Sequence, residues 1–515
     1  MFCEQVFCTR IGKVDMSTEN MKKPNVILII ADQWRGDFLG YTGNQFVETP
    51  YLNDLARKGI TFNSAYSPVP TCIPARANLF TGMKQENTGR VGYQDGVDWE
   101  YPNYLAGEFS KNNYQTQAIG KMHVFPSRFR AGFDNVILHD GFLHSQRKLT
   151  QTVSETADFV DDYVAWAKRE LGNRFDIMDM GLECNSFVTH PWIYPEFTHP
   201  TNWVAEMARD FFRRKDPTVP YFLYLSFHRP HAPYDPPQSY LNIYENKDLP
   251  EPPVGDFAKP DPDGDGWFVE TQVGIVQHDA MIRARKAYSA AVTHIDHQIG
   301  RIISHLVDTG EADNTIIVFT SDHGDLLGDH NLWRKSSPLE GSSRVPLIIY
   351  DPTGRLNYKP GTISEELVTL WDIMPTLLDL TDIAIPETVD GKSIVKLLND
   401  EIESYEYIHG EHSHGNRSYH MIRTQDKWKY SWFDQTGEEW LFDLDKDPEE
   451  LHNLVYMAAQ EDANSKLNKK LMELRNVLIE ELKDREEGYV LDGKLQLGRP
   501  ILTSLKNSYI NGEKE

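Results

Sequence analysis

Apolar residues occur along the chain in short unbroken runs that alternate with helical patterns. The first run, Asn25 to Ile30, has the continuous apolar character of a strand that is buried on both faces of a parallel sheet. Further runs of this kind cover 115–120, 221–227 and 315–320. Between the runs, apolar residues at three- and four-residue spacing from Tyr288 to Leu306 predict a helix that ends before Gly310. This alternation predicts an α/β fold with a parallel sheet.

Polar residues follow each of these four predicted strands. Asp32 and Gln33 come directly after the first strand. The other three strands are followed by Lys121 and His123, by His228 and His231, and by Asp322 and His323. Open parallel sheets bind ligands beyond the carboxyl ends of their strands, so we expect these side chains to converge on one site.

The pattern changes near residue 401. Short strand-like pieces at 405–409, 419–423, 428–433 and 440–444 precede a charged helical stretch at 462–484. They predict a small antiparallel sheet with a packed helix. The predicted organisation is a disordered tail at 1–24, a catalytic domain at 25–400, a subdomain at 401–485 and a C-terminal tail at 486–515. Two stretches rich in proline and aromatic residues, 178–203 and 232–274, are expected to be irregular.

Composition limits the partners. Asp and Glu total 77 against 52 Lys and Arg, a formal net charge of −25, which disfavours nucleic acid and anionic membranes. The first 24 residues lack a signal-peptide pattern and no later run approaches a membrane span, so a cytoplasmic protein is expected. Met16 or Met21 could equally be the start, which leaves a periplasmic location open. The cysteines at 3, 8, 72 and 184 show neither a disulfide framework nor zinc-type spacing.

The segment Cys72-Ile73-Pro74-Ala75-Arg76, followed by Leu79-Phe80-Thr81-Gly82, carries the most specific chemical signal. A proline suits the first turn of a helix, Arg76 falls on the same helical face as Cys72, and Gly82 can end the helix. Cys72 is therefore expected near the amino end of a helix, where anions are stabilised. Taken alone, the pentapeptide also fits a buried structural cysteine.

This segment resembles the sulfatase signature, Cys-x-Pro-x-Arg with a downstream Thr-Gly, and the resemblance extends from Asn25 to about Leu454. It implies an alkaline-phosphatase-like fold: a large mixed, mainly parallel sheet sandwiched by helices, with a smaller C-terminal subdomain of antiparallel sheet and helix. It also implies that a maturing enzyme oxidises Cys72 to formylglycine, that the hydrated aldehyde is the nucleophile, and that Arg76 orients the modified residue. The element from Trp440 to Leu454 resembles a packing element of the sulfatase C-terminal subdomain.

Asp32, Gln33, Asp322 and His323 resemble the sulfatase metal ligands, with Cys72 in its modified form beside them. Taken separately, an Asp after a strand is usually a turn or cap residue, and a lone His is usually satisfied by neighbours. Oxygen-rich donors favour a hard cation, so Ca²⁺ is expected, with Mg²⁺ and Mn²⁺ as alternatives. Many sulfatases have Asp where this chain has Gln33 and Asn where it has His323. The residues present here resemble those of phosphonate monoester hydrolases and some sulfatases.

Four further residues resemble the sulfate-binding and acid–base groups of the family. Lys121 and His123 match its Gly-Lys-x-His element, in which the Lys binds sulfate and the His takes a proton from the aldehyde hydrate. His231 matches a histidine that acts as general acid for the departing alkoxide, and His228 is the weaker candidate for that role. Lys335 resembles the second sulfate-binding lysine. Together these groups would surround one anionic transition state.

The resemblance implies hydrolysis of a sulfate monoester, with a sulfated sugar as the expected substrate. A phosphonate monoester or phosphodiester hydrolase with the same residues is the main alternative, followed by a silent anion-binding protein and by an enzyme that uses Cys72 as a thiolate. The oligomeric state is not predicted.

Glu340 and Arg344 are expected to form a structural ion pair. Residues with aromatic rings or hydrogen-bonding side chains are expected to contact the sugar. They are His190, Trp192, His199, Trp333, Arg334, His412, His414, Asn416 and Arg417.

Overall fold

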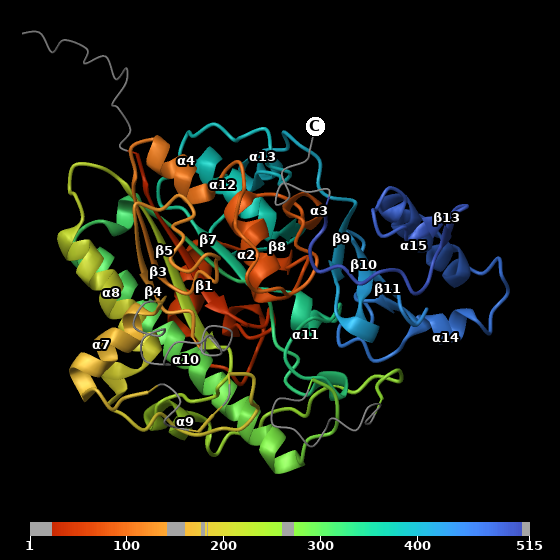
Figure 1. The fold of residues 1–515 in the computed structure, drawn as a ribbon, viewed down its shortest axis with the longest axis horizontal. Helices are drawn as coiled ribbons and strands as arrows, with labels where there is room; N and C mark the ends of the chain where they lie inside the picture. Colours follow the sequence, from red (N-terminus) through yellow and green to blue (C-terminus); the bar gives the residue numbers. More distant parts are fainter. Residues whose placement is uncertain (1–22, 142–159, 177–180, 183, 260–271, 507–515) are drawn as a thin grey trace, which may run out of the picture.

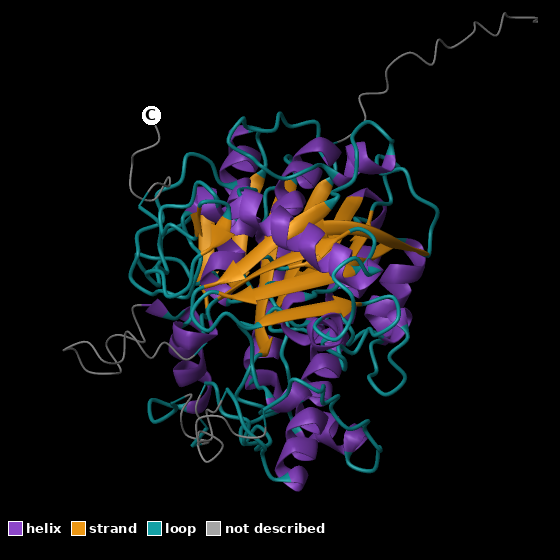
Figure 2. Ribbon diagram, turned by 90° about the vertical axis from the view of Figure 1, so that its right-hand side faces the viewer, coloured by secondary structure: helices purple, strands orange, loops and turns teal. Residues whose placement is uncertain are grey.

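The computed structural model of the chain describes residues 23–141, 160–176, 181–182, 184–259 and 272–506. A large sheet crosses its centre with helices on both faces, and a small sheet with its own helices lies to one side (Figures 1 and 2). The predicted N-terminal tail lies almost wholly outside the described residues. Within them, no helix combines the length and apolar character that crossing a membrane requires.

The large sheet contains, within the described residues, eight strands in the order β4-β3-β5-β1-β6-β7-β2-β8. The bounds are β1 (Asn25–Asp32), β2 (Ile60–Tyr66), β3 (Gln115–Gly120), β4 (Asn135–Leu138), β5 (Tyr221–Pro230), β6 (Thr315–Ser321), β7 (Leu347–Tyr350) and β8 (Thr362–Thr369). β7 runs antiparallel to both of its neighbours, and the other pairs are parallel. The prediction of a mixed, mainly parallel sheet is confirmed.

The central strand β1 is covered on both faces, which explains the continuous apolar run in its sequence. Ile27 and Ile29 belong to the hydrophobic cluster on one face of the sheet, and Val26 and Leu28 belong to the cluster on the opposite face. Successive side chains of a strand point to opposite faces, so a strand covered on both sides needs an apolar residue at every position.

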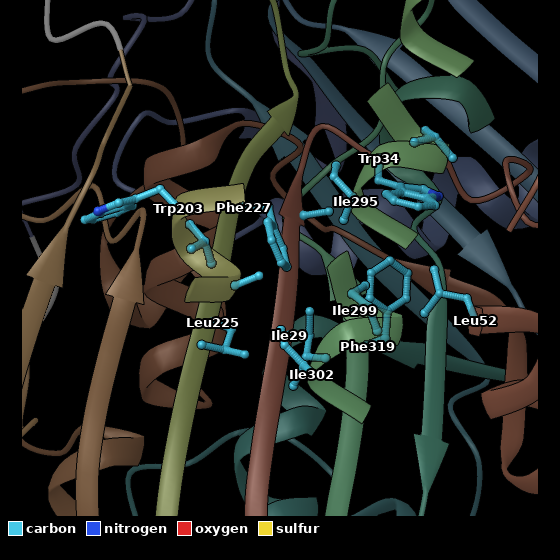
Figure 3. Close-up of a cluster of buried hydrophobic side chains, with 14 of the residues drawn as sticks. Ile29, Trp34, Leu52, Trp203, Leu225, Phe227, Ile295, Ile299, Ile302 and Phe319 are labelled. Atoms are coloured by element: carbon cyan, nitrogen blue, oxygen red, sulfur yellow. The ribbon is translucent and has the colours of Figure 1, made fainter. Parts of the chain in front are cut away.

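Helices cover both faces of the large sheet. One face packs against α1 (Pro50–Lys58), α7 (Asp162–Leu171), α8 (Pro200–Arg214) and α10 (His278–Asp308). The other face packs against α2 (Cys72–Thr81), α4 (Leu105–Lys111), α12 (Ile373–Leu380) and α13 (Ile394–Leu398). Figure 3 shows Ile295, Ile299 and Ile302 of α10 directed at Ile29 of β1 and its neighbours. The three- and four-residue spacing therefore predicted the buried face of α10 correctly.

The two stretches predicted to be irregular both contain helix. α8 begins at Pro200, inside the first stretch, and the His199 ring caps it by accepting a hydrogen bond from Thr201 N at 3.1 Å. α9 (Gln238–Tyr244) lies inside the second stretch and follows Pro237. The prediction was wrong at these points because the prolines stand at helix starts, where a missing N–H costs nothing.

Two shorter helices, outside these stretches, are α3 (Gln85–Thr88) and α11 (Glu340–Ser343).

The small sheet is antiparallel, as predicted, and its strands follow the order β12-β11-β10-β9. Its elements are β9 (Tyr407–His412), β10 (Tyr419–Thr424), β11 (Trp428–Phe433), β12 (Glu439–Asp443), α14 (Leu454–Ala458) and α15 (Lys466–Leu482), followed by the short strands β13 (Val490–Leu491) and β14 (Lys494–Leu495). Leu474 and Leu478 of α15 pack against Ile422 and Tyr430 of the sheet. The boundaries of the predicted domains stay predictions.

A buried group of ion pairs joins the two parts. Arg344 Nε lies 2.8 Å from Glu340 Oε2, which confirms the predicted pair. Lys429, from the small sheet, also binds Glu340 at 2.6 Å and reaches Glu450 at 2.9 Å. Because a buried charge is costly unless it is paired, this group favours one fixed placement of the small sheet.

Candidate active site

Polar side chains from four strands meet at one edge of the large sheet. β3, β5, β1 and β6 are successive parallel neighbours, so their carboxyl ends share that edge. Gln33 N donates to Asp322 Oδ1 at 3.1 Å, and His231 N donates to Asp32 O at 3.1 Å. The Lys121 ammonium, from the end of β3, forms an ion pair with Asp32. The predicted convergence is confirmed.

Cys72 is the first residue of α2, and the helix ends at Gly82, whose φ of 67° lies in the left-handed region that glycine favours. Both features follow the sequence prediction. Cys72 Sγ lies 3.2 Å from His323 Nε2, 3.4 Å from Lys335 Nζ and 3.6 Å from Lys121 Nζ. Residue 72 therefore stands among cationic and ionisable groups contributed by three other segments of the chain.

These neighbours change the pKa of the Cys72 thiol. Burial and the Asp32 carboxylate raise the pKa, but Lys121, Lys335 and His323 lower it and prevail, so the pKa lies well below its ordinary value. An anionic group at this position is stabilised by fixed positive charge as well as by the helix amino end.

Two carboxylates and an imidazole approach Cys72 from β1 and β6. Ligand atoms of Asp32, Cys72, Asp322 and His323 all lie within 4.8 Å of one another, and all four residues are buried. We call this set the catalytic-edge cluster. Burial and the Asp32 carboxylate raise the pKa of Asp322, because two like charges compete in a small space. Two carboxylates with a nitrogen donor fit a divalent cation, whose charge would relieve that repulsion.

Gln33 lies beside the catalytic-edge cluster, with its amide held by other partners. Its Oε1 accepts a hydrogen bond from Lys335 Nζ at 2.8 Å, and its Nε2 donates to Asp325 Oδ2 at 2.5 Å. Its φ of 69° is uncommon for a residue with a side chain and turns the chain sharply after β1. Gln33, itself one of the predicted metal ligands, thus connects the other predicted ligands with the predicted sulfate-binding lysine, and its role as a ligand stays a prediction.

Arg76 is fully buried beneath the site and hydrogen-bonds to residues on or directly after β3, β5 and β6. Its Nε donates to Asp322 Oδ2 at 2.9 Å, and its Nη1 donates to Lys121 O at 2.6 Å and to Tyr224 Oη at 2.8 Å. The resemblance implied that Arg76 holds and orients the modified residue 72. The hydrogen bonds of Arg76 to the Asp322 carboxylate and the Lys121 backbone fix it beneath the site, and its Nη2 is buried without a hydrogen bond within the described residues. The role of Arg76 stays a prediction.

One cavity joins the predicted catalytic side chains. It has a volume of about 540 Å³ and is lined by Cys72, Lys121, His123, His231 and Lys335. Its remaining lining residues are Thr71, Tyr93, Asp95, Asp140, Cys184, Asn185, His228, Gln272, Arg334, Ser336, His412 and His414. A cavity of this size can hold a small ester with both its anionic and its alcohol portions.

The surroundings of His123 were not predicted. Its Nε2 lies 3.5 Å from Asp95 Oδ1, and Tyr93 donates to the same carboxylate at 2.9 Å. Asp140 accepts hydrogen bonds from the backbone N–H groups of Met122 and His123 at 2.7 and 3.1 Å. Burial lowers the pKa of His123, but Asp95 and the neighbouring thiol raise it above its ordinary value. These acidic residues stand in loops without periodicity, so no local sequence pattern indicated a role for them.

His231 has a defined tautomer. Its Nδ1 lies 2.7 Å from Ala232 O, and a carbonyl only accepts, so Nδ1 carries the proton and Nε2 is free to exchange one. Burial and the charge of Lys335 lower the pKa of His231 well below its ordinary value. In the absence of an anion, His231 is therefore neutral.

The nine residues expected to contact a sugar divide into three groups. Arg334, His412 and His414 line the cavity. Trp333, Asn416 and Arg417 line an adjoining cavity of about 290 Å³, which shares Gln272, Lys335 and Ser336 with the first. Trp192 and His199 are buried in the core, where their rings pack 5.1 Å apart, and His190 lies outside both cavities. The structure places none of these three at either cavity, because the segment that carries them runs along residues 234–236, where His190 N donates to Tyr234 O and Trp192 N donates to Pro236 O.

Comparison with known proteins identifies the family to which the chain belongs. The sulfatase family model matches residues 24–383, and the model "N-sulphoglucosamine sulphohydrolase, C-terminal" matches residues 328–477. An arylsulfatase of Clostridium perfringens is 49% identical over 484 residues, which cover 93% of this chain and 99% of that protein. The chain therefore belongs to the sulfatase family and is a sulfuric ester hydrolase. The family implies a metal ion and a formylglycine, and the catalytic-edge cluster is the candidate position for the metal.

More distant relatives show the range of this fold. A choline-sulfatase of Rhizobium meliloti is 30% identical over 449 residues, covering 84% of this chain and 82% of that protein. Solved structures include a phosphonate monoester hydrolase of Agrobacterium radiobacter, with a TM-score of 0.68, 24% identity and coverage of 88% of this chain and 95% of that one. Another, in complex with D-glucosamine-2-N,6-O-disulfate as its substrate, also has a TM-score of 0.68, with 21% identity and coverage of 90% and 98%. At these identities, the two structures establish the fold alone.

Proposed function

We propose that this enzyme hydrolyses a sulfate monoester of a carbohydrate, with residue 72 acting as formylglycine. The observation that carries the proposal is the position of Cys72 at the amino end of α2, within 3.7 Å of Lys121, Lys335, His323 and Asp32. A hydrated formylglycine supplies a hydroxyl that displaces the alcohol from sulfur, and it releases sulfate afterwards by returning to the aldehyde. A serine would be left as a stable sulfate ester.

Lys121 and Lys335 bind the sulfate group. Their ammonium groups approach Cys72 Sγ from two different segments, so the sulfuryl oxygens would be held from both sides. Fixed cations in a site closed to bulk water stabilise the charge that develops in the transition state. A divalent cation held by Asp32, Asp322 and His323 would add Lewis-acid stabilisation, and oxygen donors favour Ca²⁺, with Mg²⁺ and Mn²⁺ as alternatives.

His231 donates a proton to the departing alcohol oxygen. In the resting enzyme its Nε2 is unprotonated, because burial and Lys335 hold its pKa low. A bound sulfate brings negative charge between the two lysines, which offsets their effect and raises the affinity of Nε2 for a proton. Substrate binding thus prepares His231 as a general acid.

His123 takes the proton that must leave when sulfate is released. Asp95 contacts its Nε2 and Asp140 holds its backbone, so the ring is oriented from two sides. His231 therefore protonates the departing alcohol, and His123 removes the proton when the aldehyde is regenerated.

The carbohydrate part of the proposal rests on the polar character of the cavity beyond the sulfate position. Hydrogen-bonding groups from Arg334, His412 and His414 and the Tyr93 ring line it, which suits a polyhydroxylated ring. The family model that matches residues 328–477 is named for an N-sulphoglucosamine sulphohydrolase, and this also favours a sugar sulfate.

Mass spectrometry of the peptide that contains residue 72 tests the nucleophile. Conversion of the thiol to the aldehyde lowers the peptide mass by about 18 daltons. An intact thiol in active protein that was produced together with a formylglycine-generating enzyme would contradict the mechanism.

Rates on sulfate monoesters and phosphate diesters, measured side by side, test the reaction. We expect sulfate monoesters to react with the higher kcat/KM. Dominant diester activity would favour the phosphonate monoester or phosphodiester hydrolase that Gln33 and His323 resemble.

A further inference from the structure

The strand β9 brings the small sheet to the cavity. Its free edge lies against the larger part of the molecule (Figure 1), where Glu411 N donates to Pro68 O at 2.9 Å and Ser413 N donates to Val91 O at 2.8 Å. These two bonds flank His412. They fix its backbone on the segments that lead into and follow α2, and therefore next to the catalytic-edge cluster.

Alternation along β9 decides where the His412 ring points. Glu411 faces the interior of the small subdomain, where its carboxylate makes a bidentate ion pair with Arg485 at 2.8 and 2.9 Å. The next side chain of an extended strand points the opposite way. His412 accordingly lines the cavity that Cys72 also lines.

The His412 ring has unused hydrogen-bonding groups. It is 1% exposed, and within the described residues neither ring nitrogen has a hydrogen-bond partner. Its ring contact with His414 is edge-on, with the centroids 5.9 Å apart, and supplies no such bond. A buried polar group without a partner is costly, and native proteins keep few of them.

The charge state of His412 defines the group that it can bind. Burial and the positive charges of His414 and His323 lower its pKa to about 3, so the ring is neutral at neutral pH. A neutral imidazole offers one donor and one acceptor. Sulfate oxygens only accept, whereas a hydroxyl group both donates and accepts.

We propose that His412 is a substrate-binding residue that hydrogen-bonds a hydroxyl group on the alcohol portion of the sulfate ester. The inference rests on the proposed carbohydrate function and assigns one contact within it. A sugar hydroxyl satisfies a ring nitrogen that the free protein leaves without a partner. An aryl sulfate whose ring carries no hydroxyl group gains no hydrogen bond from this side chain.

The test replaces His412 by Phe and compares two kinds of substrate. For wild-type enzyme and His412→Phe, kcat/KM is measured on 4-nitrophenyl sulfate and on a panel of monosulfated hexoses and hexosamines. We expect a loss of roughly 10- to 100-fold on the sugar sulfates that the wild type cleaves and a change of less than about threefold on the aryl sulfate. His412→Asn, which keeps a donor and an acceptor, should recover part of the loss.

His409→Phe is the matched control. His409 lies on the same strand with its ring on the other face, and both of its nitrogens have neighbours, Gln85 Nε2 at 3.3 Å and His420 Nδ1 at 3.2 Å. This variant should lower the melting temperature and leave the ratio of sugar to aryl activity unchanged. His412→Phe should not lower the melting temperature, because it removes polar atoms that have no partner.

The possible outcomes separate the inference from the proposed function. Equal losses on both kinds of substrate would make His412 a general catalytic or structural residue and overturn the inference. No loss on sugar sulfates would overturn it as well, while leaving the carbohydrate function in place. A wild-type enzyme that cleaves none of the sugar sulfates would refute the carbohydrate function, and the inference would fall with it.

Discussion

Within the described residues, two buried clusters carry side chains that metals commonly bind, and they differ in how their charges are satisfied. The catalytic-edge cluster combines two carboxylates, a cysteine and a histidine. The second cluster, which we call the small-sheet cluster, consists of His409, Glu411 and His420. In both clusters the potential ligand atoms lie within 4.8 Å of one another. Ligand type and proximity therefore do not distinguish them.

The small-sheet cluster is satisfied without an ion. Arg485 neutralises its one carboxylate, and its two imidazoles lie 3.2 Å apart, within hydrogen-bonding distance. In the catalytic-edge cluster, burial and the Asp32 carboxylate raise the pKa of Asp322 although Arg76 pairs with it, and Cys72 opens onto a cavity. Two carboxylates held close together beside an accessible space indicate a functional site, whereas a single carboxylate neutralised by one arginine indicates a structural one.

The largest expected contrast comes from Cys72→Ala. This change removes the nucleophile and should lower kcat/KM on an aryl sulfate by roughly 10⁴-fold or more. The corresponding change in the small-sheet cluster, His420→Gln, should stay within about tenfold of the wild type, because His420 bonds within the small sheet and lines neither cavity. Comparable losses in the two variants, measured on protein shown to be folded, would remove the distinction.

Metal content gives the next contrast. Elemental analysis should find about one divalent ion per chain in the wild type and in Glu411→Gln, and much less in Asp322→Asn. Treatment with a chelator should abolish activity in proportion to the ion removed. A second ion that disappears in Glu411→Gln would make the small-sheet cluster a metal site after all.

Lys335→Ala should lower kcat/KM by roughly 10²- to 10³-fold, because it removes one fixed cation from the sulfate position. Lys446, whose side chain is 79% exposed, provides the control, and Lys446→Ala should leave the rate unchanged. Restoration of activity in Lys335→Ala by added methylammonium would support a role of charge alone. A loss of less than about threefold would exclude Lys335 from sulfate binding.

The smallest effect concerns pH and stability. Burial raises the pKa of Glu411, but Arg485 prevails and holds it at about 2, below the ordinary value of 4.5. A lowered folded-state pKa contributes stability that is fully present above about pH 4.5 and is lost as the pH falls toward 2. The contribution is at most about 3 kcal/mol. Urea denaturation between pH 6 and pH 3 should show a steeper loss of stability in the wild type than in Glu411→Gln, and parallel curves would contradict this assignment.

Much of the fold and of the candidate site was predictable, because it depends on short sequence patterns. The apolar run of β1, the spacing in α10 and the Cys72 to Gly82 segment each specify one element through short-range rules. The polar residues after the strands were found because a parallel sheet brings its carboxyl ends to one edge. The helix α8 was missed because Pro200 marks a helix start as readily as a loop.

Partners that come from distant segments were not predictable. Asp95 and Asp140 act on His123 from loops with no periodicity, and nothing in their neighbourhood distinguishes them from ordinary surface acids. Trp192 resembles a ligand-binding aromatic in sequence and is a core residue in the structure.

The sequence alone indicated the candidate catalytic residues, because the motif around Cys72 and the strand-end Asp and His residues follow from local order. Only the tertiary structure decided which of several histidines line the cavity. His409 and His412 are three residues apart on β9, and one is bonded inside the small subdomain while the other lines the cavity. That difference depends on the register of β9 against residues 68 and 91, which are far away in the sequence. Long-range docking of this kind leaves no local pattern, and so it becomes visible only when the chain is folded.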